Sequence, residues 1–138
     1  MKHFKMSEFE VSRVAELAGV RNFVPVECHD NVRRLVGLTL DPLREAIGRP
    51  IYITSGYRTP WLNREVGGAD NSYHLSGMAA DITTRDDQGN VRMLVALLEL
   101  RLPFTELGIY LKPNGVVTRL HIALDPNFAA RKIYYKLS

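Results

Sequence analysis

The middle of the chain contains the stretch Ser72-Tyr73-His74-Leu75-Ser76-Gly77-Met78-Ala79-Ala80-Asp81. Glycine tolerates the positive φ angles of a tight reversal, so Gly77 predicts a turn at this point. The small and apolar residues that follow predict a strand over 78–83, which carries Asp81. A buried carboxylate is costly unless it has a partner. We therefore expect Asp81 to interact with another group, and His74 lies seven residues before it.

A second histidine follows in the segment Arg119-Leu120-His121-Ile122-Ala123-Leu124. Side chains of a strand alternate between its two faces, so the apolar neighbours of His121 point to the core and His121 projects from the other face. Two imidazoles and one carboxylate are a common protein ligand set for catalytic zinc, with water in the fourth position. On spacing alone, Asp81 and His74 could equally hydrogen-bond to each other or to the backbone. Surface or packing roles are expected for the other two histidines, His3 and His29.

A β-hairpin is expected around Asn114-Gly115, a strong signal for a two-residue turn. Counting outward from that turn pairs the residues of one face as Leu111 with Thr118, Ile109 with Leu120, and Leu107 with Ile122. The opposite face then pairs Tyr110 with Arg119, Gly108 with His121, and Glu106 with Ala123. The first face is core-like and the second is polar, so the register is self-consistent. Glycine at position 108 leaves space beside the imidazole.

The rest of the chain alternates predicted helices with further strands. Helices are expected to start at Ser7 and to span Ser12–Ala18, Cys28–Ile47 with a break at Pro42, Pro60–Val66, and Val91–Leu102. Strands are expected at Ile51–Thr54 and Lys132–Lys136. Together these elements predict an α+β fold, a small antiparallel sheet flanked by helices. One domain over residues 1–138 is expected, with residues 1–24 as an N-terminal helical extension within it.

Composition and charge narrow the classes of protein to consider. The 138 residues are 46% apolar and 24% charged, as in an ordinary soluble domain. No apolar run approaches the roughly 20 residues that cross a bilayer, so no membrane partner is expected. A net charge of +3 is the only feature that favours nucleic-acid binding, and no basic stripe interleaved with aromatic residues supports it. The single cysteine excludes an intramolecular disulfide, and residues 1–8 lack the apolar region of a signal peptide, so synthesis in the cytoplasm is expected.

The pattern Ser72-x-His74-x-x-Gly77-x-Ala79-x-Asp81 resembles the signature of the zinc D-Ala-D-Ala carboxypeptidase family. That family includes cell-wall carboxypeptidases, D-Ala-D-Ala dipeptidases and phage endolysin peptidases, and it shares its fold with the hedgehog signalling domain. The preceding Ile53-Thr54-Ser55-Gly56-Tyr57-Arg58-Thr59-Pro60 resembles the family's Ser-Gly-Tyr-Arg segment, and Asn63 and Gly67-Gly68 also fit. The resemblance is densest over residues 43–82, with a third anchor at His121.

This resemblance implies a hedgehog-like, D-Ala-D-Ala peptidase-like fold and a set of site residues. It implies that His74, Asp81 and His121 bind Zn²⁺. It also implies that Arg58 contacts substrate or stabilises the transition state, since a guanidinium presents a fixed fork of hydrogen-bond donors. Contacts with substrate are further expected from Tyr57, Ser72 and Tyr110.

One position departs from the family's pattern. Many members carry a glutamate three residues before the last histidine, where it acts as the general base, and this chain has Thr118 there. Threonine cannot accept a proton at neutral pH. The predicted hairpin places Glu106 diagonal to His121 on the same face of the sheet, within reach of a long side chain. Our hypothesis is that Glu106 replaces the missing base; Asp70 and Asp125 are weaker candidates that fit turns equally well.

The sequence thus predicts a monomeric zinc metallopeptidase that hydrolyses peptide bonds involving D-alanine in the stem peptide of bacterial peptidoglycan. A carboxypeptidase and an endolysin-type endopeptidase are both compatible with it. The expected target lies in the cell wall, so a cytoplasmic product would need release, as for a phage-type lysin. The alternative, which Thr118 motivates, is a catalytically impaired, zinc-bearing module that binds peptidoglycan or a protein.

Overall fold

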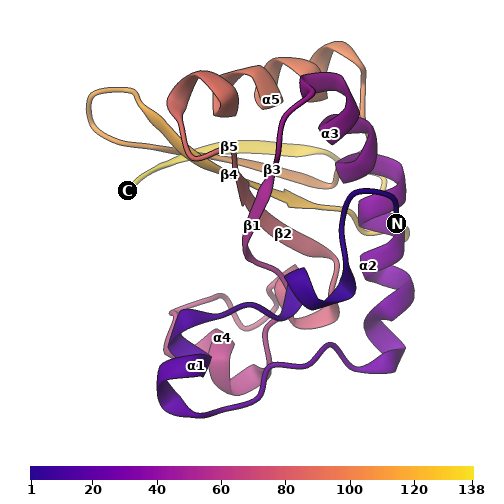
Figure 1. Ribbon diagram of the computed structural model, residues 1–138, viewed down its shortest axis with the longest axis vertical. Coiled ribbons are helices and arrows are strands. Elements are labelled where there is room, and N and C mark those ends of the chain that lie inside the picture. The colour runs from indigo at the N-terminus through magenta and orange to yellow at the C-terminus, as the bar shows by residue number, and fades with distance from the viewer.

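The computed structural model describes residues 1–138 and is built on a five-stranded sheet with the order β1-β2-β4-β3-β5 (Figure 1). The strands are β1 (Tyr52–Ser55), β2 (Ala79–Thr83), β3 (Glu106–Leu111), β4 (Val117–Ala123) and β5 (Lys132–Leu137). The first four pair antiparallel, and β5 joins the edge parallel to β3. The predicted α+β class is confirmed, but the sheet is mixed rather than antiparallel, because the chain crosses over before β5 instead of forming another hairpin.

Five α-helices surround this sheet. They are α1 (Arg13–Ala18), α2 (His29–Leu35), α3 (Asp41–Ile47), α4 (Pro60–Glu65) and α5 (Asp87–Glu99). The predicted break at Pro42 takes the form of a π turn over Val36–Leu40, which joins α2 to α3. Proline has no N–H to donate to the carbonyl of residue 38, so the regular ladder cannot run through this point. No helix is long and apolar enough to cross a membrane.

Short capped segments form the first part of the chain. Ser12 caps α1 by accepting a hydrogen bond from the Ala15 N–H, and Gly19 ends that helix at a φ of 68°, as predicted. The expected helix start at Ser7 is instead a 3₁₀ segment over Met6–Glu10, in which Glu8 accepts from the Lys5 N–H. The earlier start follows from this contact and from the hydrogen bond of the Glu8 N–H to the Lys5 carbonyl, because the two bonds satisfy backbone N–H groups that the turn would otherwise leave unpaired.

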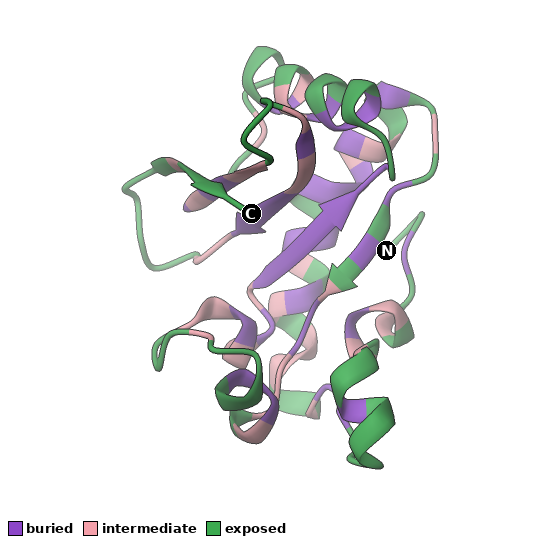
Figure 2. Ribbon diagram, turned by 90° about the vertical axis from the view of Figure 1, so that its left-hand side faces the viewer, coloured by how far each residue is buried: buried purple, intermediate pink, exposed green.

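The apolar core lies between the helices and one face of the sheet. Figure 1 shows α3 and α5 at one end of the molecule and α1 and α4 at the other. The main core members from the sheet are Ile82, Leu107, Leu120 and Ile122, and they pack with Leu35, Val36, Leu40, Leu43 and Leu97 from the helices. Phe4, Phe9 and Val24 join the same cluster, so residues 1–24 contribute to the core. The central strands are almost wholly buried (Figure 2).

The hairpin between β3 and β4 has the predicted register near the site, but its loop differs from the predicted two-residue turn. The loop has three residues, Pro113-Asn114-Gly115, because the Lys112 N–H donates to the Val116 carbonyl at 2.9 Å. Leu111 therefore pairs with Val117, and the predicted pair Leu111–Thr118 is wrong. A β-bulge at Thr118 then absorbs the extra residue. From Tyr110 opposite Arg119 onward, the pairing matches the prediction down to Glu106 opposite Ala123.

Candidate metal centre

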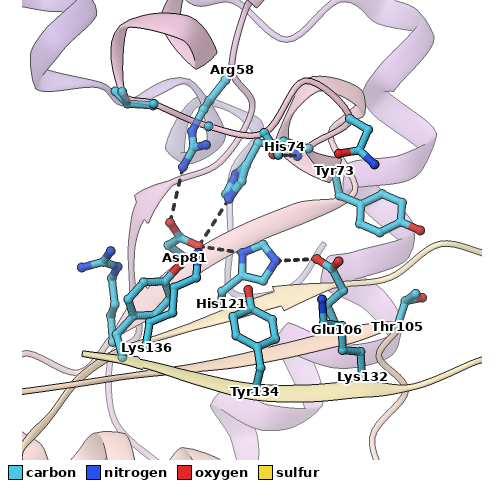
Figure 3. A pocket seen from close by; sticks show the side chains of 18 of the residues that line it. Arg58, Tyr73, His74, Asp81, Thr105, Glu106, His121, Lys132, Tyr134 and Lys136 are labelled. Carbon is cyan, nitrogen blue, oxygen red and sulfur yellow. Dashed lines mark hydrogen bonds and ion pairs between the residues drawn. The ribbon is translucent and has the colours of Figure 1, made fainter. Parts of the chain in front are cut away.

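Three buried side chains from separate elements converge on the face of the sheet opposite the core. His74 comes from a 3₁₀ turn over Tyr73–Ser76, Asp81 from β2 and His121 from β4. Asp81 lies directly opposite His121 in the sheet, so pairing alone brings these two together. Asp81 Oδ1 is 2.9 Å from His121 Nδ1 and 3.3 Å from His74 Nε2 (Figure 3). The predicted convergence of these residues is confirmed.

The backbone around His74 fixes the direction of its ring. Its Nδ1 donates a hydrogen bond to the Gly56 carbonyl at 2.6 Å, which leaves Nε2 facing Asp81. The His74 N–H donates to Ser72 Oγ, and the His74 carbonyl accepts from the Arg58 N–H. Gly77 closes the turn at a φ of 74°, a conformation that few other residues adopt. Gly56, Ser72 and Gly77 therefore all help to orient His74 so that its Nε2 faces Asp81.

His121 lies between two carboxylates. Its Nδ1 is bonded to Asp81, and its Nε2 is 2.9 Å from Glu106 Oε1. Burial disfavours the charged ring, but the hydrogen bonds with Asp81 and Glu106 outweigh it and raise the pKa of His121 to about 9. Burial likewise opposes ionisation of Asp81, yet the bonds from His121 and His74 hold its pKa well below the usual range. The hydrogen bond from His121 also lowers the pKa of Glu106.

This donor set fits a zinc ion. One ligand atom from each of His74, Asp81 and His121 lies within 4.8 Å of the other two. Both imidazoles have their remaining nitrogen engaged, by the Gly56 carbonyl and by Glu106. Such outer partners are typical of metal-binding histidines, because they fix the tautomer and orient the ring. The proton that His121 shares with Asp81 is the one that a metal would replace.

Arg58 approaches Asp81 from the side that faces away from the sheet (Figure 3). Its Nη2 lies 3.6 Å from Asp81 Oδ2. Its Nε donates to Ser55 Oγ at 3.0 Å and its Nη1 to Asn63 Oδ1 at 3.2 Å. Gly68 permits this packing, because a Cβ there would lie 2.1 Å from Asn63 Oδ1. The guanidinium is thus held rigidly beside the three candidate ligands.

The cluster opens into a pocket of about 780 Å³. The lining includes the three candidate ligands together with Arg58, Ser72, Glu106, Tyr110, Arg119, Arg131, Lys132, Tyr134 and Lys136. A second hollow of about 460 Å³ shares Arg58, Val66, Asp81 and Arg119 with it and continues past Arg13 and Leu62. The two hollows therefore meet at Arg58 and Asp81, among more cationic than anionic side chains.

Most of the predicted site residues line this pocket, but Tyr57 and the two weaker base candidates, Asp70 and Asp125, do not. Tyr57 is only 6% exposed and packs in the apolar core, since the hydrogen bond from its N–H to the Phe9 carbonyl turns it away from the sheet face. Thr118 donates its hydroxyl to the Tyr110 carbonyl. Asp125 accepts from the Tyr73 hydroxyl and from a turn N–H, and Asp70 is exposed outside the pocket.

Sequence reasoning missed the contribution of β5. Lys132, Tyr134 and Lys136 all line the pocket. The alternation of this strand indicates that the three share a face. What it could not indicate was the partner strand, because a parallel edge strand follows a crossover and not a turn.

Comparison with known proteins agrees with this geometry. The sequence model of the family Peptidase M15 matches residues 2–117. A zinc D-Ala-D-Ala carboxypeptidase from Streptomyces albus G is 46% identical over 44 residues, which cover 31% of this chain and 17% of that protein. The family match ends before His121, and the structure supplies the third candidate ligand four residues further on. The chain therefore belongs to the Peptidase M15 family.

Proposed function

We propose that this protein is a zinc-dependent peptidase that hydrolyses peptide bonds involving D-alanine in bacterial peptidoglycan. The observation that carries the proposal is the cluster of His74, Asp81 and His121 at the base of an open pocket, in a chain that belongs to a peptidase family. The likeness to a zinc D-Ala-D-Ala carboxypeptidase supports the choice of metal and of substrate.

Each of the chain's own groups has a distinct task in this proposal. His74, Asp81 and His121 hold zinc, which when bound polarises the scissile carbonyl and lowers the pKa of its water. Arg58 Nη2 lies beside these ligands, 3.6 Å from Asp81 Oδ2, and can donate to the carbonyl oxygen as negative charge develops there. Its bonds to Ser55 and Asn63 fix that orientation in advance, so little reorganisation is needed during the reaction.

Glu106 takes the role that Thr118 cannot fill. Its side chain is 28% exposed in the pocket, and its lowered pKa keeps it ionised at neutral pH. An ionised carboxylate that lines the pocket can accept a proton from the attacking water and pass it to the leaving amine. Its hydrogen bond to His121 also orients that ligand, so we assign Glu106 both a positioning and a proton-transfer function.

The shape and charge of the site suit a peptide with free carboxylates. The two hollows meet at Asp81 and Arg58, on one side of the cluster, which leaves room for substrate on both sides of the cleaved bond and favours an endopeptidase. Arg131, Lys132 and Lys136 line one side and can pair with the carboxylates of a stem peptide. A carboxypeptidase would instead place its substrate's terminal carboxylate against one of these cations.

Purified muropeptides provide the test. Incubation with and without a zinc chelator, followed by mass spectrometry, should show metal-dependent release of a fragment that ends or begins with D-alanine. The mass of the fragment distinguishes a carboxypeptidase from an endopeptidase. Intact muropeptides after incubation with the fully zinc-loaded protein would rule out the proposed activity.

The position of Thr118 favours a second candidate, a zinc-bearing module that binds the cell wall or a protein without turnover. Its hydroxyl is used in the β-bulge and cannot act as a base. This alternative predicts stoichiometric zinc and measurable binding to peptidoglycan sacculi, but no release of amines. Any metal-dependent amine release from muropeptides excludes it.

A further inference from the structure

One row of residues runs straight across the sheet through the metal centre. Ser55, Asp81, His121, Gly108 and Tyr134 each lie opposite the next, on β1, β2, β4, β3 and β5. Directly paired residues of neighbouring strands share a face of the sheet. Tyr134 is therefore on the same face as the candidate ligands, although it lies in the last strand of the chain.

Glycine in the fourth place of this row allows Tyr134 to lean toward His121. A Cβ on Gly108 would lie 2.7 Å from both Cζ and Oη of Tyr134, so no other residue fits beneath the ring as it stands. The ring centres of Tyr134 and His121 are 6.3 Å apart. In Figure 3 the hydroxyl of Tyr134 is directed toward His121 and into the pocket. The space beside the imidazole is thus filled by a phenol from β5.

Two lysines flank the ring of Tyr134. Lys132 Nζ lies 5.3 Å and Lys136 Nζ 5.9 Å from the centre of the Tyr134 ring, one on each side along β5. A phenol is protonated at neutral pH, so its hydroxyl is available as a donor. Tyr135, the next residue, is 69% exposed and absent from the pocket lining. The strand therefore offers one tyrosine at the site and one matched tyrosine away from it.

We propose that the Tyr134 hydroxyl contacts the substrate at the metal centre and donates a hydrogen bond to the carbonyl oxygen of the bond being cut. Tyr134 keeps its proton, and no bond to it forms or breaks. The contribution is stabilisation of the charge that develops on that oxygen, from the side opposite to Arg58. This inference rests on the proposed function. It adds a residue beyond 2–117, the part of the chain that matches the family.

The variant Tyr134→Phe tests the hydroxyl alone, because the ring and its packing over Gly108 remain. Loss of a donor to a developing oxyanion should lower kcat on muropeptides about 100-fold, with KM nearly unchanged. Zinc content and melting temperature should equal those of the wild type. Tyr135→Phe is the matched control and should leave kcat unchanged. A Tyr134→Phe enzyme with wild-type kcat would overturn the proposal.

A second measurement does not depend on turnover. Acetohydroxamate chelates zinc through its oxygens and needs no particular substrate side chain, so its binding to the zinc-loaded protein can be followed by calorimetry. Loss of one hydrogen bond should weaken its binding about tenfold in Tyr134→Phe and not in Tyr135→Phe. Equal binding by all proteins, or no binding by the wild type, contradicts the proposal. If binding of acetohydroxamate depends on Tyr134 but no muropeptide is cleaved, the Tyr134 contact is supported and the proposed peptidoglycan substrate is wrong.

Discussion

The metal centre is assembled from two regions that fix their side chains in different ways. The motif half, residues 54–83, contributes Arg58, His74 and Asp81, and it places the first two through local backbone hydrogen bonds to the Gly56 and His74 carbonyls. The register half, residues 105–137, contributes Glu106, His121 and Tyr134 through strand pairing. In the motif half, hydrogen bonds within one continuous segment place the Arg58 and His74 side chains. In the register half the geometry depends on which residues of β3, β4 and β5 pair with one another.

The largest effect is expected from breaking the motif half at His74. His74→Ala removes one candidate ligand, so zinc should be lost, and activity should fall by more than the roughly 100-fold that loss of an outer partner costs. His3→Ala is the matched control, because His3 lies away from the pocket beside Glu45. Zinc content by mass spectrometry and muropeptide cleavage measure the result. A His74→Ala protein that still holds one zinc and cleaves at the wild-type rate would refute the assignment.

Breaking the register half at Glu106 should separate catalysis from metal binding. Glu106→Gln keeps the size of the side chain and removes the charge, so kcat should fall roughly 100-fold or more. Zinc affinity should fall about tenfold at most, because the amide oxygen can still accept from His121. Glu99→Gln, on the exposed end of α5, serves as the control. The role of Glu106 as base is wrong if Glu106→Gln binds zinc and cleaves muropeptides as the wild type does.

The protonation of His121 tests the register half directly, because a metal bound at His121 Nδ1 must displace the proton that this atom shares with Asp81. Zinc binds the neutral imidazole, and the pKa of His121 in the metal-free protein is about 9. Below that pH each binding event releases one proton, so the apparent zinc affinity should rise about tenfold per pH unit and level off near pH 9. Competition titrations against a chelator at several pH values measure this slope. An affinity that does not change between pH 6.5 and 8.5 would contradict it.

The smallest effect is expected at the hairpin loop. Gly115 has a φ of 88°, where an alanine is strained even though nothing lies within 4 Å of the added Cβ. Gly115→Ala should lower the free energy of unfolding in urea by roughly 1 kcal/mol. Zinc binding should not change, because the bulge at Thr118 restores the pairing before the site. Gly37→Ala, which adds a Cβ in open space at an ordinary φ, should not destabilise. Zinc loss in Gly115→Ala would mean that the loop itself sets the register.

The sequence predicted the motif half well because its signals are local. The signals that predict the cap at Thr59, the turn at Gly77 and the strand that carries Asp81 come from neighbouring residues of the sequence. The face on which His121 lies was also predictable, since alternation and a polar–apolar division define it. The length of the loop was not predictable. A three-residue loop followed by a bulge gives the same pairs, from Tyr110–Arg119 to Glu106–Ala123, as a two-residue turn without a bulge.

The errors have a common origin in long-range contacts. Tyr57 belongs to the Ser-Gly-Tyr-Arg segment, but its place in the core depends on Phe9, 48 positions away. Tyr134 reaches the site only because β5 pairs parallel to β3. The sequence of Lys132–Leu137 does not indicate which strand β5 pairs with. Local sequence defines which face a side chain takes, whereas the neighbours of an edge strand follow from the whole fold.

Anomalous diffraction at the zinc absorption edge, from crystals of the zinc-loaded protein, tests the central claim most directly. We predict one strong anomalous peak with His74 Nε2, Asp81 Oδ1 and His121 Nδ1 as ligands, at the roughly 2.0–2.2 Å typical of zinc bound to imidazole and carboxylate. A peak elsewhere on the molecule, or stoichiometric zinc with any of these three side chains turned away from it, would contradict the account.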